Sequence, residues 1–311
     1  MRVALMIEGQ EGVTWPQWLA LAQAAEAADL DALFRSDHYG TVDGDEQGSL
    51  DALATLTALG GLTTRIRLGT LVSPATFRHP SLVARTAVTA DHVSNGRFEL
   101  GLGAGWNERE HAAYGFPFPP VRERFELLEE QLQVVRGQWE QDPFSFAGRH
   151  YRLVEGCARP HPLQARLPII VGGGPGPWLL RLAARYADEY NTIFISPDEA
   201  RQRWSLVEAA CRREGRDAAT LRYSLMLPAL VGRTAAEVRE RAAKVGQARG
   251  EDAGSVLADV ARLGVAGTVE EAAERLRRYA DAGVQRVMLQ HQDHSDVEMV
   301  AVLGEIARAV R

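Results

Sequence analysis

The chain has 311 residues, two distant cysteines (Cys157 and Cys211) and a net charge of −6. This acidic balance argues against nucleic acid or an anionic membrane as the main partner, and the cysteine spacing predicts neither a zinc site nor a disulfide framework. The first residues enter an apolar segment without the pattern of a signal peptide, and no apolar run has membrane-spanning length, so we expect a cytoplasmic protein.

Short apolar segments alternate with helical patterns along the chain, and Pro- and Gly-rich turns separate them. Segments with the length and composition of strands are residues 3–7, 32–36, 66–72, 97–102, 168–171, 191–195, 222–230 and 286–290. Helical spacing is clearest at residues 50–59, 80–93, 121–139, 178–186 and 297–310. Ser196, Thr234 and Thr268 each stand three residues before a Glu, which is the capping-box pattern of a helix start.

This alternation predicts parallel strands joined by crossover helices. Eight strand–helix units without an intervening linker predict one domain over residues 1–311, an α/β fold of the (β/α)8 TIM-barrel type. Residues 106–120 and 140–167 are irregular, and we expect them to be insertions on βα loops that cap the site. A doubly wound open sheet would fit the same alternation.

In a barrel, the residues just past each strand form the active face. The strand at 32–36 runs into Asp37 and His38, a titratable pair that could position or protonate a ligand. The alternative is that Asp37 caps a turn and His38 is polar surface. The strand at 66–72 runs into Ser73, where an ordinary βα turn is the simpler interpretation.

The strand at 97–102 should point Phe98, Leu100 and Leu102 toward the helices. Glu99 then faces the barrel interior together with two glycines, which would let a flat ring approach the backbone. A buried carboxylate is costly without a partner, and we expect Arg35 on the strand at 32–36 to supply one.

A glycine-rich segment, GGGPGP at 172–177, follows the strand at 168–171 and precedes a helix. Backbone N–H groups at a helix start favour an anion, most often phosphate, although a tight turn would need the same glycines. The segment has the spacing of neither a P-loop nor a dinucleotide fingerprint. After the last strand, His291 and His294 lack further ligands for a metal, so we expect no metal and place His291 at the rim of a substrate pocket.

The chain resembles the luciferase-like monooxygenase family, and within it the F420-dependent oxidoreductases. The resemblance extends over nearly the whole chain and is carried by SDHY at 36–39, by the segment 68–118, by RFELLEEQLQVVRGQW at 124–139 and by LPIIVGGGP at 167–175. It implies a barrel that holds F420, or alternatively FMN, at the carboxyl ends of its strands, and a homodimer.

The resemblance also implies roles for individual residues. Asp37 and His38 match the pair that contacts the deazaflavin ring and serves catalysis. Leu71–Val72 matches the place of a non-proline cis peptide in a bulge behind the ring, and Ser73 matches a hydroxyl contact. The remaining matches to cofactor contacts are Ala104, Gly105, Asn107, Gly173, Gly174, Gly176 and Pro177.

One position departs from the family pattern. The sugar-phosphate dehydrogenases of this family carry a proton-donating Glu where this chain has Trp106. The departure puts that activity in doubt, assigns Trp106 to the substrate pocket and leaves His38 as the acid/base group. We expect hydride transfer with a small organic substrate. The alternatives are an FMN monooxygenase served by a separate reductase and a flavin-binding protein without catalysis.

Overall fold

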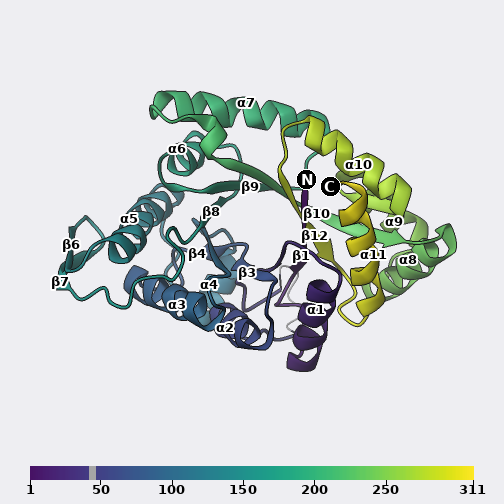
Figure 1. Cartoon of the computed structure of the whole chain (residues 1–311), viewed down its shortest axis with the longest axis horizontal. Helices are drawn as coiled ribbons and strands as arrows, with labels where there is room; N and C mark the ends of the chain where they lie inside the picture. The colour runs from purple at the N-terminus through teal and green to yellow at the C-terminus, as the bar shows by residue number, and fades with distance from the viewer. Residues whose placement is uncertain (42–46) are drawn as a thin grey trace.

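The computed structural model describes residues 1–41 and 47–311. Within these residues, eight parallel strands close into a ring in which each strand pairs with the next and the last pairs with the first (Figure 1). In ring order they are β1 (Arg2–Ile7), β2 (Ala32–Arg35), β3 (Arg67–Thr70), β5 (Phe98–Gly103), β8 (Ile169–Gly172), β9 (Glu189–Ile193), β10 (Arg222–Gly232) and β12 (Arg286–His291). The predicted (β/α)8 barrel is confirmed.

Helices form the outer layer around this ring (Figure 1). In chain order they are α1 (Trp15–Ala27), α2 (Ala52–Leu62), α3 (Pro80–Val93), α4 (Glu108–Tyr114), α5 (Val121–Glu140), α6 (Pro177–Tyr186), α7 (Pro197–Arg213), α8 (Ala235–Arg249), α9 (Ala253–Leu263), α10 (Val269–Asp281) and α11 (Val297–Ala309). Ser196 and Thr268 form the predicted capping boxes at the starts of α7 and α10. No helix in the described ranges has both the length and the apolarity needed to cross a membrane.

Four short strands were not predicted as such. The strand expected at 66–72 ends at Thr70, and Ser73–Pro74 forms a separate strand, β4, that pairs with β5. A further strand, β11 (Val265–Thr268), pairs with the end of β10. The insertion 140–167 contains an antiparallel hairpin of β6 (Phe144–Ala147) and β7 (Arg152–Gly156), which lies on the outer side beside α5 (Figure 1).

The strands divide their side chains between two cores, as their alternation requires. Phe98, Leu100 and Leu102 pack toward the helices, as predicted, in a large buried cluster. A smaller apolar cluster fills the barrel interior and includes Met6, Phe34 and other side chains of the opposite parity. A ligand at the strand ends therefore rests on a packed interior and not on an open channel.

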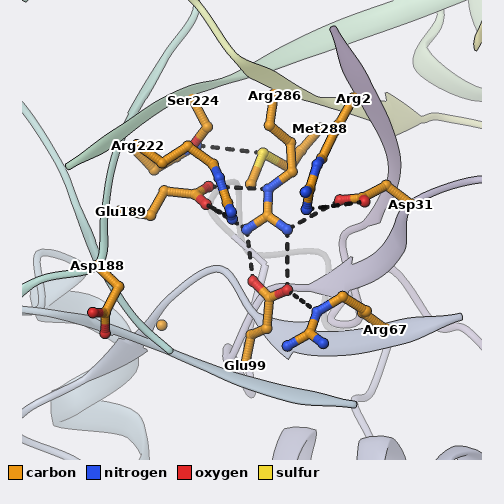
Figure 2. Close-up of polar contacts among 12 residues, drawn as sticks. Arg2, Asp31, Arg67, Glu99, Asp188, Glu189, Arg222, Ser224, Arg286 and Met288 are labelled. Atoms are coloured by element: carbon orange, nitrogen blue, oxygen red, sulfur yellow. Dashed lines mark hydrogen bonds and ion pairs between the residues drawn. The ribbon is translucent and has the colours of Figure 1, made fainter. Parts of the chain in front are cut away.

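The amino-terminal end of the barrel is closed by an ionic cluster, drawn in Figure 2. Arg286 of β12 is fully buried and binds Glu99 of β5 and Glu189 of β9, each at 2.6 Å. Arg67 adds a further contact to Glu99, and Arg222 one to Glu189 at 3.0 Å. Burial alone would raise the pKa of Glu99, but Arg286 and then Arg67 hold it at about 2.

The prediction that Arg35 pairs with Glu99 was wrong. Phe34 occupies the barrel interior, so its neighbour Arg35 points to the opposite side of β2, toward the helices. There its guanidinium lies over the ring of Trp18 at 4.9 Å and donates to the carbonyl of Ser36 at 2.9 Å. Arg286, which starts the last strand, takes the place that we expected Arg35 to fill.

Candidate active site

A cavity of about 660 Å³ lies at the carboxyl ends of the strands, within the size range of small-molecule and cofactor sites. Its wall draws on β4 (Ser73–Pro74), β5, β8, β9, β10 and β12, on the segments that follow β1, β2 and β3, and on the starts of α5 and α6. The structure brings together nine of the predicted site residues on this wall: His38, Leu71, Val72, Ala104, Gly105, Trp106, Gly173, Gly174 and Gly176. No residue of the insertion 140–167 belongs to it, so the expectation that this insertion caps the site was wrong.

One side of the cavity is formed by the segment between β3 and β4. The Leu71–Val72 peptide bond is cis, as the resemblance implied. Val72 projects over glycines of two neighbouring strands: a Cβ atom added at Gly103 or Gly172 would come within 2.7 or 2.8 Å of its methyl groups. The glycines therefore allow Val72 to lie against the strands, which leaves a low, apolar surface on which a flat ring can rest.

The glycine loop at 173–176 forms another part of the wall. It leads directly into α6, whose N-cap is Gly176, and the space beside Gly174 and Gly176 is open. The N–H of Gly173 is already used, because it donates to the carbonyl of Asn191 at 3.0 Å. An anion would therefore meet the later part of the loop and the start of the helix, where peptide dipoles favour negative charge.

Arg124, at the start of α5, lies on the same wall. The α5 and α6 starts are adjacent, since Phe125 packs edge-on against Trp178 with ring centroids 5.6 Å apart. The Arg124 guanidinium lies over the Phe118 ring at 3.9 Å, and its buried Nε has no hydrogen-bond partner among the described residues. This cation near the glycine loop completes a site suited to phosphate.

His38 lies in a different part of the cavity from the phosphate-type site, after β2. Its Nδ1 is 2.7 Å from Oε2 of Glu110, and its ring meets that of Trp106 edge-on at 5.7 Å. Burial would lower the pKa of His38, but the hydrogen bond and charge of Glu110, with the charges of Glu8 and Asp37, raise it above its ordinary value. The imidazole is therefore suited to hold a proton at neutral pH.

Asp37 is buried and turned away from the cavity wall. Both of its oxygens bind Arg78, which also contacts the hydroxyl of Tyr39 at 2.8 Å and Asp51 at 2.6 Å. This network fixes the backbone on either side of His38. The contact between Asp37 and a cofactor that the resemblance implies stays a prediction.

Four other predicted residues lie near the wall without belonging to it. Asn107 is the N-cap of α4 and accepts from the N–H of Glu110, while Pro177 opens α6. Ser73 is buried beside Val72, and its hydroxyl has no partner among the described residues. His291 is buried below the rim, with Nε2 2.8 Å from the carbonyl of Asp296.

Sequence reasoning missed several residues of the site. Glu8 and Glu11 follow β1 on the cavity wall. Arg124 stands on the helix predicted at 121–139, and Glu110 lies in the segment 106–120, which we expected to be irregular. Position after a strand could have indicated the first two, but a charged residue on a helix gives no comparable signal.

The residues present fit a flavin or deazaflavin that carries a phosphate. The low surface at Val72 can take the ring, and the open loop with Arg124 can take the anion. The hydroxyl of Ser73 and the Nε of Arg124 are buried polar atoms that need partners. Elsewhere in the described ranges, no three His, Cys, Asp or Glu side chains gather as metal ligands.

Solved structures with the same fold include an F420-dependent secondary alcohol dehydrogenase bound to an F420–acetone adduct. It has a TM-score of 0.84 and 22% identity and covers 100% of this chain and 99% of its own. A monooxygenase of Streptomyces bottropensis has the same TM-score at 19% identity, covering 100% of this chain and 98% of its own. At these identities the likeness concerns the fold.

Sequence relatives are more similar over part of the chain. A Mycobacterium tuberculosis protein whose name describes a coenzyme F420-dependent oxidoreductase is 37% identical over 63% of this chain. An F420-dependent glucose-6-phosphate dehydrogenase of Amycolatopsis mediterranei is 34% identical over 54% of it. The matched regions span 56% and 50% of these relatives.

A family model described as luciferase-like monooxygenase matches residues 2–286, which is nearly the whole barrel. The match therefore includes every strand from β1 to β11 and the first residue of β12, together with all residues of the cavity wall except Gln290. The chain belongs to the luciferase-like monooxygenase family.

Proposed function

We propose that this chain is an oxidoreductase that uses the deazaflavin F420 to exchange a hydride with a small organic substrate. The observation that carries the proposal is the cavity, which combines a low apolar surface at Val72, a phosphate-type site at 173–176 and His38. Family membership and the names of the two F420-dependent relatives support the choice of cofactor.

In this proposal each part of the wall has one task. A bound deazaflavin supplies or accepts a hydride. Leu71, Val72 and Gly105 hold its ring, and Arg124 with the loop 173–176 holds its phosphate. His38 holds or moves a proton at Nε2, because its Nδ1 is occupied by Glu110, and Trp106 packs edge-on against its ring.

Titration of the purified protein with F420 and with FMN, followed by cofactor fluorescence, tests the cofactor. We expect tighter binding of F420. Binding of FMN without binding of F420 would replace the proposal by the alternative of an FMN-dependent monooxygenase, for which a separate reductase would have to supply reduced flavin. Binding of neither cofactor would contradict both.

His38→Ala tests the proton-holding group. With reduced F420 and a panel of ketones that includes acetone, we expect turnover to fall about 10²- to 10⁴-fold, the range for loss of a general acid or base. The Kd for F420 should stay within about twofold of the unmodified protein, because Val72, Arg124 and the glycine loop remain. His92→Ala is the matched control, since His92 is an exposed histidine on α3. Unchanged turnover in His38→Ala would refute the role.

A further inference from the structure

Glu110 is a buried carboxylate that contacts the segment carrying His38. It lies in α4 with 3% of its surface exposed. Oε2 is 2.7 Å from Nδ1 of His38, while Oε1 accepts the backbone N–H of Tyr39 and, at 3.2 Å, that of Gly40. One carboxylate thus holds the imidazole and the next two peptide groups.

The short helix that presents Glu110 is itself anchored. The side chain of Asn107 accepts from the N–H of Glu110 at 3.2 Å. The next residue, His111, places its Nε2 2.7 Å from the hydroxyl of Thr76 and its Nδ1 2.6 Å from the carbonyl of Asn107. The carboxylate therefore has a fixed position relative to the His38 ring, as a residue that orients another must have.

The charges that face His38 come from three elements. Glu110 approaches from α4, Glu8 from the end of β1, and Asp37 from the neighbouring position, where Arg78 neutralises it. Burial raises the pKa of Glu110, but the hydrogen bond and charge of His38 and the N–H groups of Tyr39 and Gly40 lower it below its ordinary value. An ionised Glu110 favours the imidazolium form of His38.

We propose that Glu110 is a positioning residue for His38: it keeps the ring cationic and directs Nε2–H into the cavity. This inference rests on the proposed function. Because Nδ1–H donates to Glu110, Nε2–H is the donor left for a substrate. The Glu110 carboxylate lies on the side of the imidazole that faces away from the cavity, and the cavity receives a positively charged N–H.

Such a donor selects the group that it binds. An Nε2–H with positive charge pairs with a carbonyl or hydroxyl oxygen of the substrate and stabilises negative charge that develops there. Glu8 lies on the same wall and its charge faces His38, so it disfavours a substrate that is already an anion. The dyad of His38 and Glu110 thus fits an uncharged alcohol or carbonyl compound.

Glu110→Gln tests the role without removing the hydrogen bonds. Glutamine can accept from Tyr39 and Gly40 and donate to Nδ1, but it carries no charge, so the ring should become neutral. We expect the pKa of His38, read by NMR from its Cε1–H resonance and assigned with His38→Ala, to fall by about 1 unit or more. Glu108→Gln, an exposed change in the same helix, should leave the His38 pKa unchanged.

Two readouts separate this role from a merely structural one. The pH profile of turnover on a ketone should shift with the His38 pKa in Glu110→Gln and shift less in Glu110→Asp, which keeps the charge. In a His38→Ala background, Glu110→Gln should cost less than twofold further. A His38 pKa within 0.3 unit of the parent value in a folded Glu110→Gln, or equal losses with and without His38, would overturn the proposal.

The NMR titration needs neither substrate nor cofactor, so its result is independent of the proposed function. If F420 fails to bind while Glu110→Gln shifts the His38 pKa, the proposed function fails and the dyad stands. If F420 binds and the pKa does not move, the dyad fails alone. Should Glu110→Gln not fold, Glu110→Asp measured by the same titration should show a smaller shift in the same direction, and an unchanged value would count against the dyad.

Discussion

The proposed role of Arg124 in binding phosphate follows from its surroundings in the structure and not from its position in the sequence. It stacks on Phe118, lies on the cavity wall beside the glycine loop and keeps a buried Nε without a partner among the described residues. A guanidinium held over a ring has little freedom left to lose when it binds an anion. Binding of a phosphate there should therefore depend strongly on this residue.

Arg124→Ala should weaken binding of F420 about 10- to 100-fold, because a hydrogen bond to a charged group contributes about 1.5–3 kcal/mol. Binding of the phosphate-free deazaflavin core should change less than twofold. Arg122→Ala, which removes an exposed arginine from the same helix turn, is the matched control. Fluorescence titration of both ligands decides the matter, and an equal loss for both would contradict a phosphate contact.

At the scale of elements, the segment 71–74 and the glycines of β5 and β8 depend on one another. Val72 occupies the volume that side chains at Gly103 and Gly172 would take. A larger residue at either glycine must push the segment into the cavity, where the ring is proposed to lie. Overpacking of this kind typically costs about 1–3 kcal/mol.

Gly103→Ala should therefore lower both thermal stability and affinity for F420, while the double variant Gly103→Ala/Val72→Ala should recover a large part of both. The reason is that an added Cβ at 103 lies 2.7 Å from Val72 Cγ2, and shortening Val72 removes that clash. Thermal melts with and without cofactor measure the cycle. Additive losses in the double variant would show that the clash is not the cause.

The alternation of apolar and helical segments was enough to predict all eight ring strands, because the hydrophobic period is a local property of the chain. Side-chain parity within β5 was predictable for the same reason. Pairing across the barrel was not predictable in this way. Arg286 has the parity of the interior residue Met288 on its strand and meets Glu99, whereas Arg35 has the opposite parity to Phe34 and points outward. The cis peptide at Leu71–Val72 came from the resemblance alone.

At the scale of the whole molecule, the ionic cluster joins strands from distant parts of the chain (Figure 2). Arg286 connects β12 with β5 and β9, and Arg67 and Arg222 extend these contacts to β3 and β10. Buried ion pairs are expensive to break, since removal of one partner leaves an uncompensated charge in a dry environment. Closure of the ring should thus depend on this cluster.

Glu99→Gln should lower the free energy of unfolding by about 3–5 kcal/mol at neutral pH, measured by urea denaturation. In the parent protein the pKa of Glu99 is lower in the folded state than its ordinary value of 4.5. Its stabilising contribution is therefore complete above about pH 5 and is lost as the pH falls toward 2. The difference between parent and Glu99→Gln should shrink over that range, and a constant difference would contradict the assignment.

Closure of the amino-terminal end of the barrel by the ionic cluster also has a kinetic consequence. The ionic cluster occupies the amino-terminal end of the barrel. Coenzyme and substrate therefore both enter the cavity from the carboxyl ends of the strands. In the proposed function the ring lies against Val72 and the substrate lies beside His38 and Trp106, the latter 59% exposed. We expect coenzyme to enter before substrate and leave after product, so that product-inhibition patterns show a compulsory order of binding.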